Sequence, residues 1–339
     1  MNALLALVPV LLFLTALYFL DSFKLVSERL IGAALSAGAA AALLGWSLQL
    51  VVLPADTIAS PLVVRYLAPT LEELAKACPL VLFIVRRRVG FLADAVVLGF
   101  AVGAGFAFAE NVVYLRNFPD PSAGLWLVRG LGTGILHGAV SAIFTMVSKT
   151  LVDRNPERLP AMFLPGLALA IVIHSAFNHL LLPAAAQTAV MLVVLPLLVL
   201  WVFERSERAT RNWVGPGLDL DLELLQLVTS SESEGTRFGQ FLRGLRARFP
   251  GVVVADMYCL LRLELELSIQ AKALVMARGA GLALLKDDDL GAAFAEREAL
   301  QRSIGAAGML ALEPLQITTP RDLWHRQILQ QAGRGRSGA

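Results

Sequence analysis

Seven apolar stretches of bilayer-spanning length constrain this chain more than any other feature of its sequence. A helix needs about 20 consecutive apolar residues to cross the hydrocarbon core of a membrane. The chain has 339 residues, of which 57% are hydrophobic and 17% charged, whereas soluble domains are roughly 45–50% apolar and about 25% charged. We therefore expect an all-α, polytopic transmembrane helix bundle of about seven spans, at residues 2–20, 30–53, 66–85, 92–115, 125–148, 160–182 and 186–203.

The basic residues of the connecting loops predict the orientation of this bundle. They gather in alternate loops, for example at Arg86, Arg87 and Arg88 and again at Lys149, and also follow the last span. Cytoplasmic loops are enriched in lysine and arginine, so the pattern places the N-terminus outside and the C-terminus in the cytoplasm. The first stretch has no basic start and no small-residue cleavage site, so we expect it to be a retained span rather than a signal peptide.

The composition changes after the predicted transmembrane domain, which covers residues 1–203. Residues 204–332 carry many charges, and their apolar residues recur at steps of three and four, which predicts a helical cytoplasmic domain whose role stays open. The glycine-rich tail, residues 333–339, is expected to be disordered. We find no nucleotide-binding glycine motif and expect no nucleic-acid partner.

Ionisable and amide side chains interrupt four of the predicted spans. A charge at the centre of a membrane helix costs about 2.5–3.5 kcal/mol on insertion scales, so such groups usually face a partner, a cavity or a reaction site. The predicted topology places the sets of the third, fourth and sixth spans in the outer half of the membrane and His137 nearer the middle of the fifth, so all four lie at a similar depth. We therefore expect one shared polar centre made by Glu72, Glu73 and Lys76, by Glu110 and Asn111, by His137, and by His174 and Asn178.

Each of these groups also has a purely structural interpretation. Glu72 and Lys76 are four residues apart and could form an ion pair within one helix. Glu110 with Asn111 could hold two helices together, and His137 could be a hydrogen-bonded core residue. We assign structural roles to Asp94, His179 and Arg129, with Arg129 extending outward to the interface, and a surface position to His325.

In combination, these motifs resemble the PrsW family of intramembrane proteases, a relative of the CAAX prenyl endopeptidase and Abi group. The resemblance rests on "EELAK", on "FAFAEN" followed by Tyr114, on the histidine of "LHGAVS", and on "HSAFN", in that order along the chain. It implies endoproteolysis of a membrane-anchored protein, here near the outer face of the membrane. The family is linked to the first cut of an anti-sigma factor, which implies a single-pass regulatory substrate and a bacterial plasma membrane.

Peptide hydrolysis needs an activated water, stabilisation of the tetrahedral oxyanion and a proton for the leaving amine. We assign water activation jointly to Glu72 and Glu73, because the sequence does not distinguish them. His137 and His174 are expected to position the water or to move the proton, and Asn178 to donate to the oxyanion. Lys76, Glu110 and Asn111 are expected to support these groups.

Metal dependence stays open at this point. His137 and His174, together with Glu110 or a glutamate of the third span, are candidate ligands for zinc, which catalytic sites commonly bind through three protein ligands and an open position. The H-E-x-x-H signature of many zinc proteases is absent from the sequence, and a metal-free glutamate mechanism would use the same residues.

Two other functions fit a membrane protein with buried acids and histidines. Such side chains also form the proton relays of proton- or ion-coupled transporters. A non-enzymatic membrane scaffold, with the cytoplasmic helices as its binding surface, is the third hypothesis.

Overall fold

The computed structural model describes residues 1–21, 25–54, 57–117, 122–229, 237–280, 282, 290–315 and 329. The described residues are helical or lie in short connections, and they contain no β-strand. This confirms the all-α bundle predicted from the apolar stretches. His325 and the tail 333–339 lie outside the described residues.

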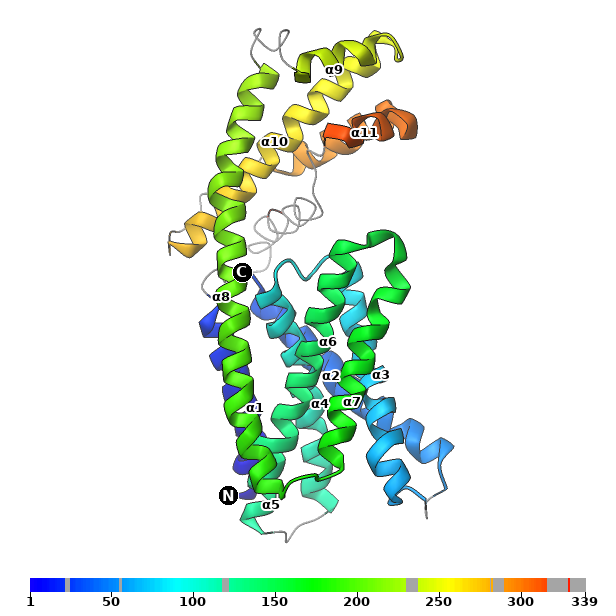
Figure 1. Ribbon diagram of the computed structural model, residues 1–339, viewed down its shortest axis with the longest axis vertical. Coiled ribbons are helices and arrows are strands. Elements are labelled where there is room, and N and C mark those ends of the chain that lie inside the picture. Colours follow the sequence, from blue (N-terminus) through cyan, green and yellow to red (C-terminus); the bar gives the residue numbers. More distant parts are fainter. Residues whose placement is uncertain are drawn as a thin grey trace. The chain divides into compact units, whose positions relative to one another are not determined.

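The chain divides into two units, Met1–Arg208 and Ala209–Ala339. Figure 1 labels the helices of both. The first unit contains α1 (Asn2–Leu20), α2 (Glu28–Val52), η1 (Val63–Leu67), α3 (Ala68–Val85), α4 (Leu92–Asn117), α5 (Ala123–Leu127), η2 (Val128–Thr133), α6 (Gly134–Arg154), η3 (Pro156–Phe163) and α7 (Leu164–Asn178). Helix α8 (Ala184–Thr229) begins in the first unit and continues past residue 203, where the last span was expected to end.

Six described helical segments are long and apolar enough to cross a membrane. They are Asn2–Leu20, Glu28–Val51, Leu92–Asn117, Ala123–Arg154, Leu159–Asn178 and Ala184–Thr229. The third predicted span corresponds to η1 and α3. Helix α3 has 18 residues, and three of them are charged, Glu72, Glu73 and Lys76. Each of the six segments, in contrast, contains an 18-residue stretch with no more than two charged residues.

Helix α4 is the centre of the first unit. It packs against α6, α2 and α1, and its side chains are buried from Ala93 through Ala107. Glycines permit this close packing on both sides of the helix. A Cβ at Gly103 would lie 2.1 Å from the carbonyl oxygen of His137 on α6, and a Cβ at Gly105 would lie 2.0 Å from the carbonyl oxygen of Leu35 on α2.

Two short π-helical segments precede helices that carry polar residues. Segment η1 leads directly into α3, and η2 leads directly into α6. A π turn contains more residues than an α turn, so it changes which side chains of the following helix face the core. Such a shift is invisible to a sequence analysis that assumes 3.6 residues per turn throughout.

The second unit is also built from packed helices. Its elements are the end of α8, α9 (Arg237–Arg246), α10 (Gly251–Gly279), α11 (Leu290–Leu312) and η5 (Glu313–Leu315). Helices α10 and α11 pack around Met257, Leu260 and Ile304. Two buried ion pairs add to this packing: Lys272 contacts Asp221 at 2.6 Å, and Arg297 pairs with Glu264.

Candidate active site

Helix α3 directs its two adjacent glutamates differently. Glu73 is buried and accepts a hydrogen bond from Lys76, with 2.5 Å between Oε1 and Nζ. Glu72 lines a cavity and retains 16% of its side-chain exposure. Successive residues of a helix lie about 100° apart, so the two carboxylates face different neighbours. The structure therefore distinguishes two groups that the sequence left equivalent.

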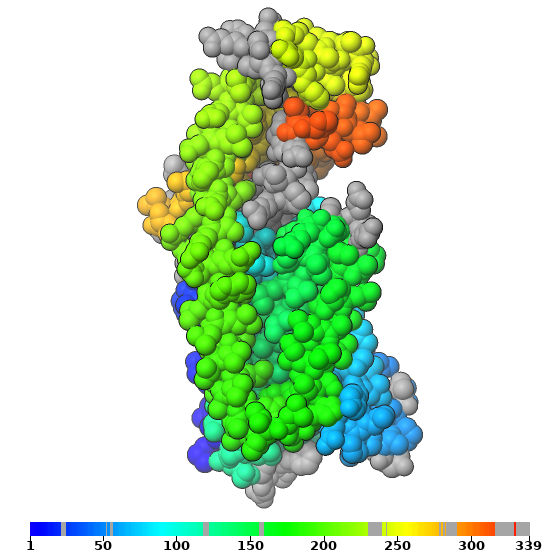
Figure 2. Space-filling view, viewed as in Figure 1, coloured from blue at the N-terminus to red at the C-terminus, as the bar shows by residue number. Residues whose placement is uncertain are grey.

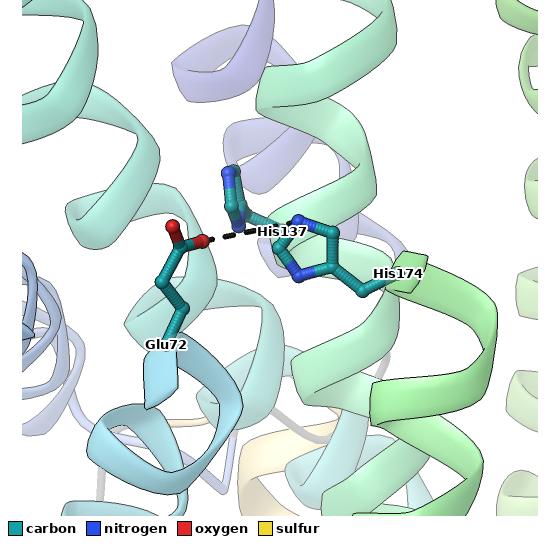
Figure 3. A group of neighbouring side chains, drawn as sticks. All are labelled: Glu72, His137 and His174. Carbon is teal, nitrogen blue, oxygen red and sulfur yellow. Dashed lines mark ion pairs between the residues drawn. The ribbon is translucent and has the colours of Figure 1, made fainter. Parts of the chain in front are cut away.

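His174, near the end of α7, connects these two glutamates. Its Nδ1 lies 2.7 Å from Oε1 of Glu73. Its Nε2 lies 3.8 Å from Oε2 of Glu72, the pair that a dashed line joins in Figure 3. Because a carboxylate can only accept, Nδ1 carries the proton and donates to Glu73. The longer gap to Glu72 exceeds a direct hydrogen bond and leaves room for a bridging water or ion.

His137, from α6, contacts a donor on one ring nitrogen and an acceptor on the other. Lys76 Nζ lies 3.1 Å from Nδ1 and Glu110 Oε2 lies 3.1 Å from Nε2. An ammonium group only donates, so Nδ1 accepts from Lys76 and Nε2–H donates to Glu110. The rings of His137 and His174 are perpendicular, with 4.9 Å between their centroids. Both imidazoles are thus fixed by charged neighbours.

Arg129, at the start of η2, corrects one expectation. Instead of extending outward, its guanidinium is 13% exposed and lies 3.2 Å from Oε1 of Glu110. Its Nε donates to the side-chain oxygen of Asn111 at 3.0 Å, and the guanidinium lies over the ring of Tyr114, 3.5 Å from the centroid. A partly buried carboxylate such as that of Glu110 is stabilised by a counter-charge, and Arg129 supplies it. The sequence did contain a signal for this pair: Glu110 has no basic residue near it on its own span, and Arg129 is a lone charge at the start of the next span.

These contacts form one continuous chain of charged and polar side chains. It connects five helical elements of the first unit, α3, α4, η2, α6 and α7, and begins and ends at residues that line the cavity. In order, the chain of contacts runs through Glu72, His174, Glu73, Lys76, His137, Glu110 and Arg129.

Asn178 lines the same cavity, but its amide is engaged elsewhere. Its Nδ2 donates to the backbone carbonyl of Val64 at 3.0 Å, and the hydroxyl of Ser175 donates to the carbonyl of Arg65 at 2.5 Å. Both carbonyls belong to the π-helical segment η1. The last turn of α7 therefore fixes the start of α3, a contact that sequence analysis did not predict for either residue.

The cavity has a volume of about 410 Å³ and two kinds of wall. One wall is polar and includes Glu72, Glu110, His137, His174 and Arg129. The other lining residues are mostly apolar and come mainly from α2, η1 and α4. All four sequence motifs thus contribute residues to one hollow or to its immediate surroundings. Lys76 and Asn111 lie in those surroundings, because they hold His137 and Arg129 respectively.

Two further predicted structural residues contact the backbone. Asp94 accepts hydrogen bonds from the backbone N–H groups of Gly90 and Phe91, at 2.9 and 2.8 Å, where α4 begins. His179 Nε2 lies 3.0 Å from the hydroxyl of Tyr66, and its Nδ1 lies 2.7 Å from the carbonyl of Ser175. Neither side chain belongs to the chain of contacts described above.

Glu72, His137 and His174 could together hold a metal ion. One ligand atom from each lies within 4.8 Å of the other two, and two histidines with one glutamate form a known catalytic zinc set. His174 also donates its other ring nitrogen to Glu73, as metal-binding histidines commonly do. For His137 to bind the metal through Nε2, its present contact with Glu110 would have to be given up in exchange for the metal. Of the two carboxylates that the sequence left open, this group contains the third-span glutamate Glu72 and not Glu110.

The charges of the site also suit a cation. Glu72, Glu73 and Glu110 supply three carboxylates, whereas Lys76 and Arg129 supply two cations. With neutral histidines one negative charge is left over, and a proton or a bound cation would compensate it. The donor types, their proximity and this excess charge together fit a metal ion.

Arg129 is expected to stabilise the fold through Glu110. Removing one partner of a buried ion pair costs about 3–5 kcal/mol, and because Glu110 is 24% exposed we expect the Arg129→Met variant to lose about 3 kcal/mol, the low end of that range. The double variant Glu110→Gln, Arg129→Met should lose less than the two single variants added together. Chemical unfolding in detergent micelles measures these losses.

Arg208→Met is the matched control, because its pair with Glu204 is exposed on both sides. It should change the free energy of unfolding by no more than about 0.5 kcal/mol. Strictly additive losses in the double variant would contradict a coupling between Glu110 and Arg129.

Comparison with known proteins agrees with this arrangement of residues. Residues 22–203 match the family described as PrsW family intramembrane metalloprotease. No curated protein and no solved structure matches the chain. The matched region covers more than half of the chain and contains every residue of the candidate site. The chain therefore belongs to the PrsW family of intramembrane metalloproteases.

Proposed function

We propose that this integral membrane protease cuts a membrane-anchored protein near the outer face of the membrane, with Glu72 as the group that activates water. The observation that carries the proposal is the convergence of Glu72, His137 and His174 on one cavity. The positive-inside rule supports an outside N-terminus and a cytoplasmic C-terminus, which puts this cavity in the outer half. Family membership favours a protease over the transporter and scaffold hypotheses.

Glu72 is the better candidate base of the two glutamates. Glu73 is already bound to Lys76 and to His174, so its oxygen is engaged on both sides. Glu72 instead faces the cavity across a 3.8 Å gap from Nε2 of His174. A water in that gap would donate one proton to Glu72 and would present its oxygen to the scissile carbonyl.

Other residues complete the hydrolysis. The proton taken up by Glu72 must reach the nitrogen of the leaving amine, and His137, as a neighbouring acid–base group, is positioned to help deliver it. Glu73 and Lys76 hold the two imidazoles in place, so we assign them positioning roles. Arg129 adds positive charge to the cavity wall, where negative charge develops on the tetrahedral intermediate. We expect Asn178 to act through the backbone of η1 rather than by donating to the oxyanion.

We further propose zinc as the bound metal, held by Glu72, His137 and His174. With zinc bound, Glu72 and His137 would act as its ligands, in place of their roles as base and acid in the metal-free route described above. Zinc at this position would polarise the scissile carbonyl and activate a bound water. A single-pass regulator of the anti-sigma type in a bacterial plasma membrane is the proposed substrate, because of the family resemblance and the depth of the cavity. The surrounding lipid bilayer is then the medium through which this substrate approaches.

The Glu72→Gln variant is expected to fold and to lose activity. Loss of a general base typically lowers the rate by a factor of about 10²–10⁴. Comparing N-terminal peptides from membranes of cells with the parent or with Glu72→Gln should reveal one truncated, membrane-anchored protein. The purified parent should then cut this protein in proteoliposomes.

Glu28→Gln is a suitable control, since Glu28 is an exposed acid at the start of α2. Its cleavage rate should equal that of the parent. If Glu72→Gln folds and cleaves like the parent, Glu72 is not the base and this assignment is wrong.

Metal removal tests the proposed ligand set. We expect purified protein to contain one zinc ion per chain, and the His174→Ala variant to lose it while His179→Ala retains it, because His179 is outside the cluster. A chelator should abolish cleavage and added zinc should restore it. Absence of bound metal from active protein, together with cleavage that resists chelators, would contradict the zinc proposal and leave Glu72 as a metal-free base.

A further inference from the structure

Helix α2 packs against α4 along only part of its length. At Gly38 an added Cβ would lie 1.9 Å from the carbonyl oxygen of Val102, so the two helices touch there. Two turns later, an added Cβ at Gly45 would meet nothing within 4 Å. On both sides of this point most side chains of the helix are exposed, namely Leu43, Leu44, Trp46, Ser47, Leu48, Leu50 and Val51. Toward its C-terminal end α2 thus keeps one buried stripe, Ala41, Ala42 and Gly45, and the rest of its surface there is open.

The active-site cavity occupies the space next to this free end. Leu43 and Trp46 of α2 line it on one side, and Ala109 and Val113 of α4 line it on another. Both α2 residues are also largely exposed, so little protein separates the cavity from the surroundings of the bundle. Figure 2 shows the neighbouring surface, where the region from α2 to α3 (blue) lies beside α7 (green), in agreement with the packing of α3 and η1 against α7.

The chemistry of the two walls indicates what could enter here. An acyl chain would satisfy the apolar wall, but it would leave the polar groups around Glu72 and Arg129 without partners, which is costly away from water. A polypeptide carries an N–H and a C=O on nearly every residue, and a membrane helix must unwind before one of its peptide bonds can be cut. The cavity offers polar partners to an unwound backbone and apolar contacts to its side chains.

We propose that the groove between the C-terminal half of α2 and α4 is the entry and docking channel for the apolar, membrane-spanning segment of the substrate. This proposal rests on the proposed proteolytic function and adds the route by which the scissile bond reaches Glu72. Leu43 and Trp46 line the channel from α2, where both are largely exposed, and Val113 lines it from α4.

Photo-crosslinking tests this route with a matched control on the same helix. Trp46 and Leu48 are equally exposed, each at 44%, but only Trp46 lines the cavity. They lie about 200° apart around α2. In a Glu72→Gln background, p-benzoylphenylalanine at position 46 should crosslink to the substrate, and at position 48 to lipid. The probe is the membrane-anchored protein whose truncation requires Glu72, purified and co-reconstituted in phosphatidylethanolamine–phosphatidylglycerol vesicles.

Filling the channel provides an independent measurement. Val113→Trp should lower the rate of cleavage roughly 10-fold or more, because misplacing the scissile bond by about 1 Å is already costly. Val112→Trp is the control, since Val112 is also half-buried on α4 but does not line the cavity. It should cleave at the rate of the parent, and both variants should unfold at the same temperature.

The outcomes separate this inference from the proposed function. If the parent cleaves the probe, Glu72→Gln does not, and position 46 nevertheless crosslinks only to lipid while Val113→Trp cleaves normally, the channel is wrong and the protease assignment stands. If the parent cleaves no membrane-anchored protein, the proposed function is wrong, and the channel proposal, which rests on that function, is wrong too.

Discussion

The structure depends on one constraint: charged groups inside an apolar helix bundle must be paired with one another. Glu73 pairs with Lys76, and Glu110 pairs with Arg129. The histidines connect these pairs, so that helices α3, α4, α6 and α7 are joined by one chain of contacts. Only the end at Glu72 keeps a gap, and that gap faces the cavity. The same pairing that permits charges in the bundle thus leaves one carboxylate available for chemistry.

Close backbone packing gives this polar network its fixed geometry. Because Gly103 has no side chain, α4 approaches α6 at the carbonyl of His137 itself. This contact sets the distance across which His137 reaches Glu110 on α4. On the other side, Ser175 and Asn178 bind carbonyls of the π-helical segment before α3 and so fix the rotation of the helix that carries both glutamates. Positioning in this site therefore comes from backbone contacts as much as from side chains.

The sequence predicted the fold class and the meeting of the four motifs, because apolar length and the cost of buried charge act on each helix separately. It could not distinguish Glu72 from Glu73, since two π-helical segments alter the facing of the helices that follow them. It also misplaced Arg129, whose partner lies 19 residues earlier on another helix. The amide of Asn178 was expected at the reaction centre, but a backbone carbonyl far away in sequence binds it. Pairings between helices decide these details, and no local pattern encodes them.

The most direct test of the account asks which glutamate faces a water-accessible cavity. Single cysteines at positions 72 and 73 can be placed in a variant whose two native cysteines, Cys78 and Cys259, are replaced by alanine. A small, charged, membrane-impermeant thiol reagent is then added to the outside of intact cells. We predict rapid labelling at position 72 and protection at position 73, as the burial of Glu73 requires. Two results would contradict an outward-facing cavity at Glu72: labelling of position 73 with protection of position 72, or no labelling of either position from outside.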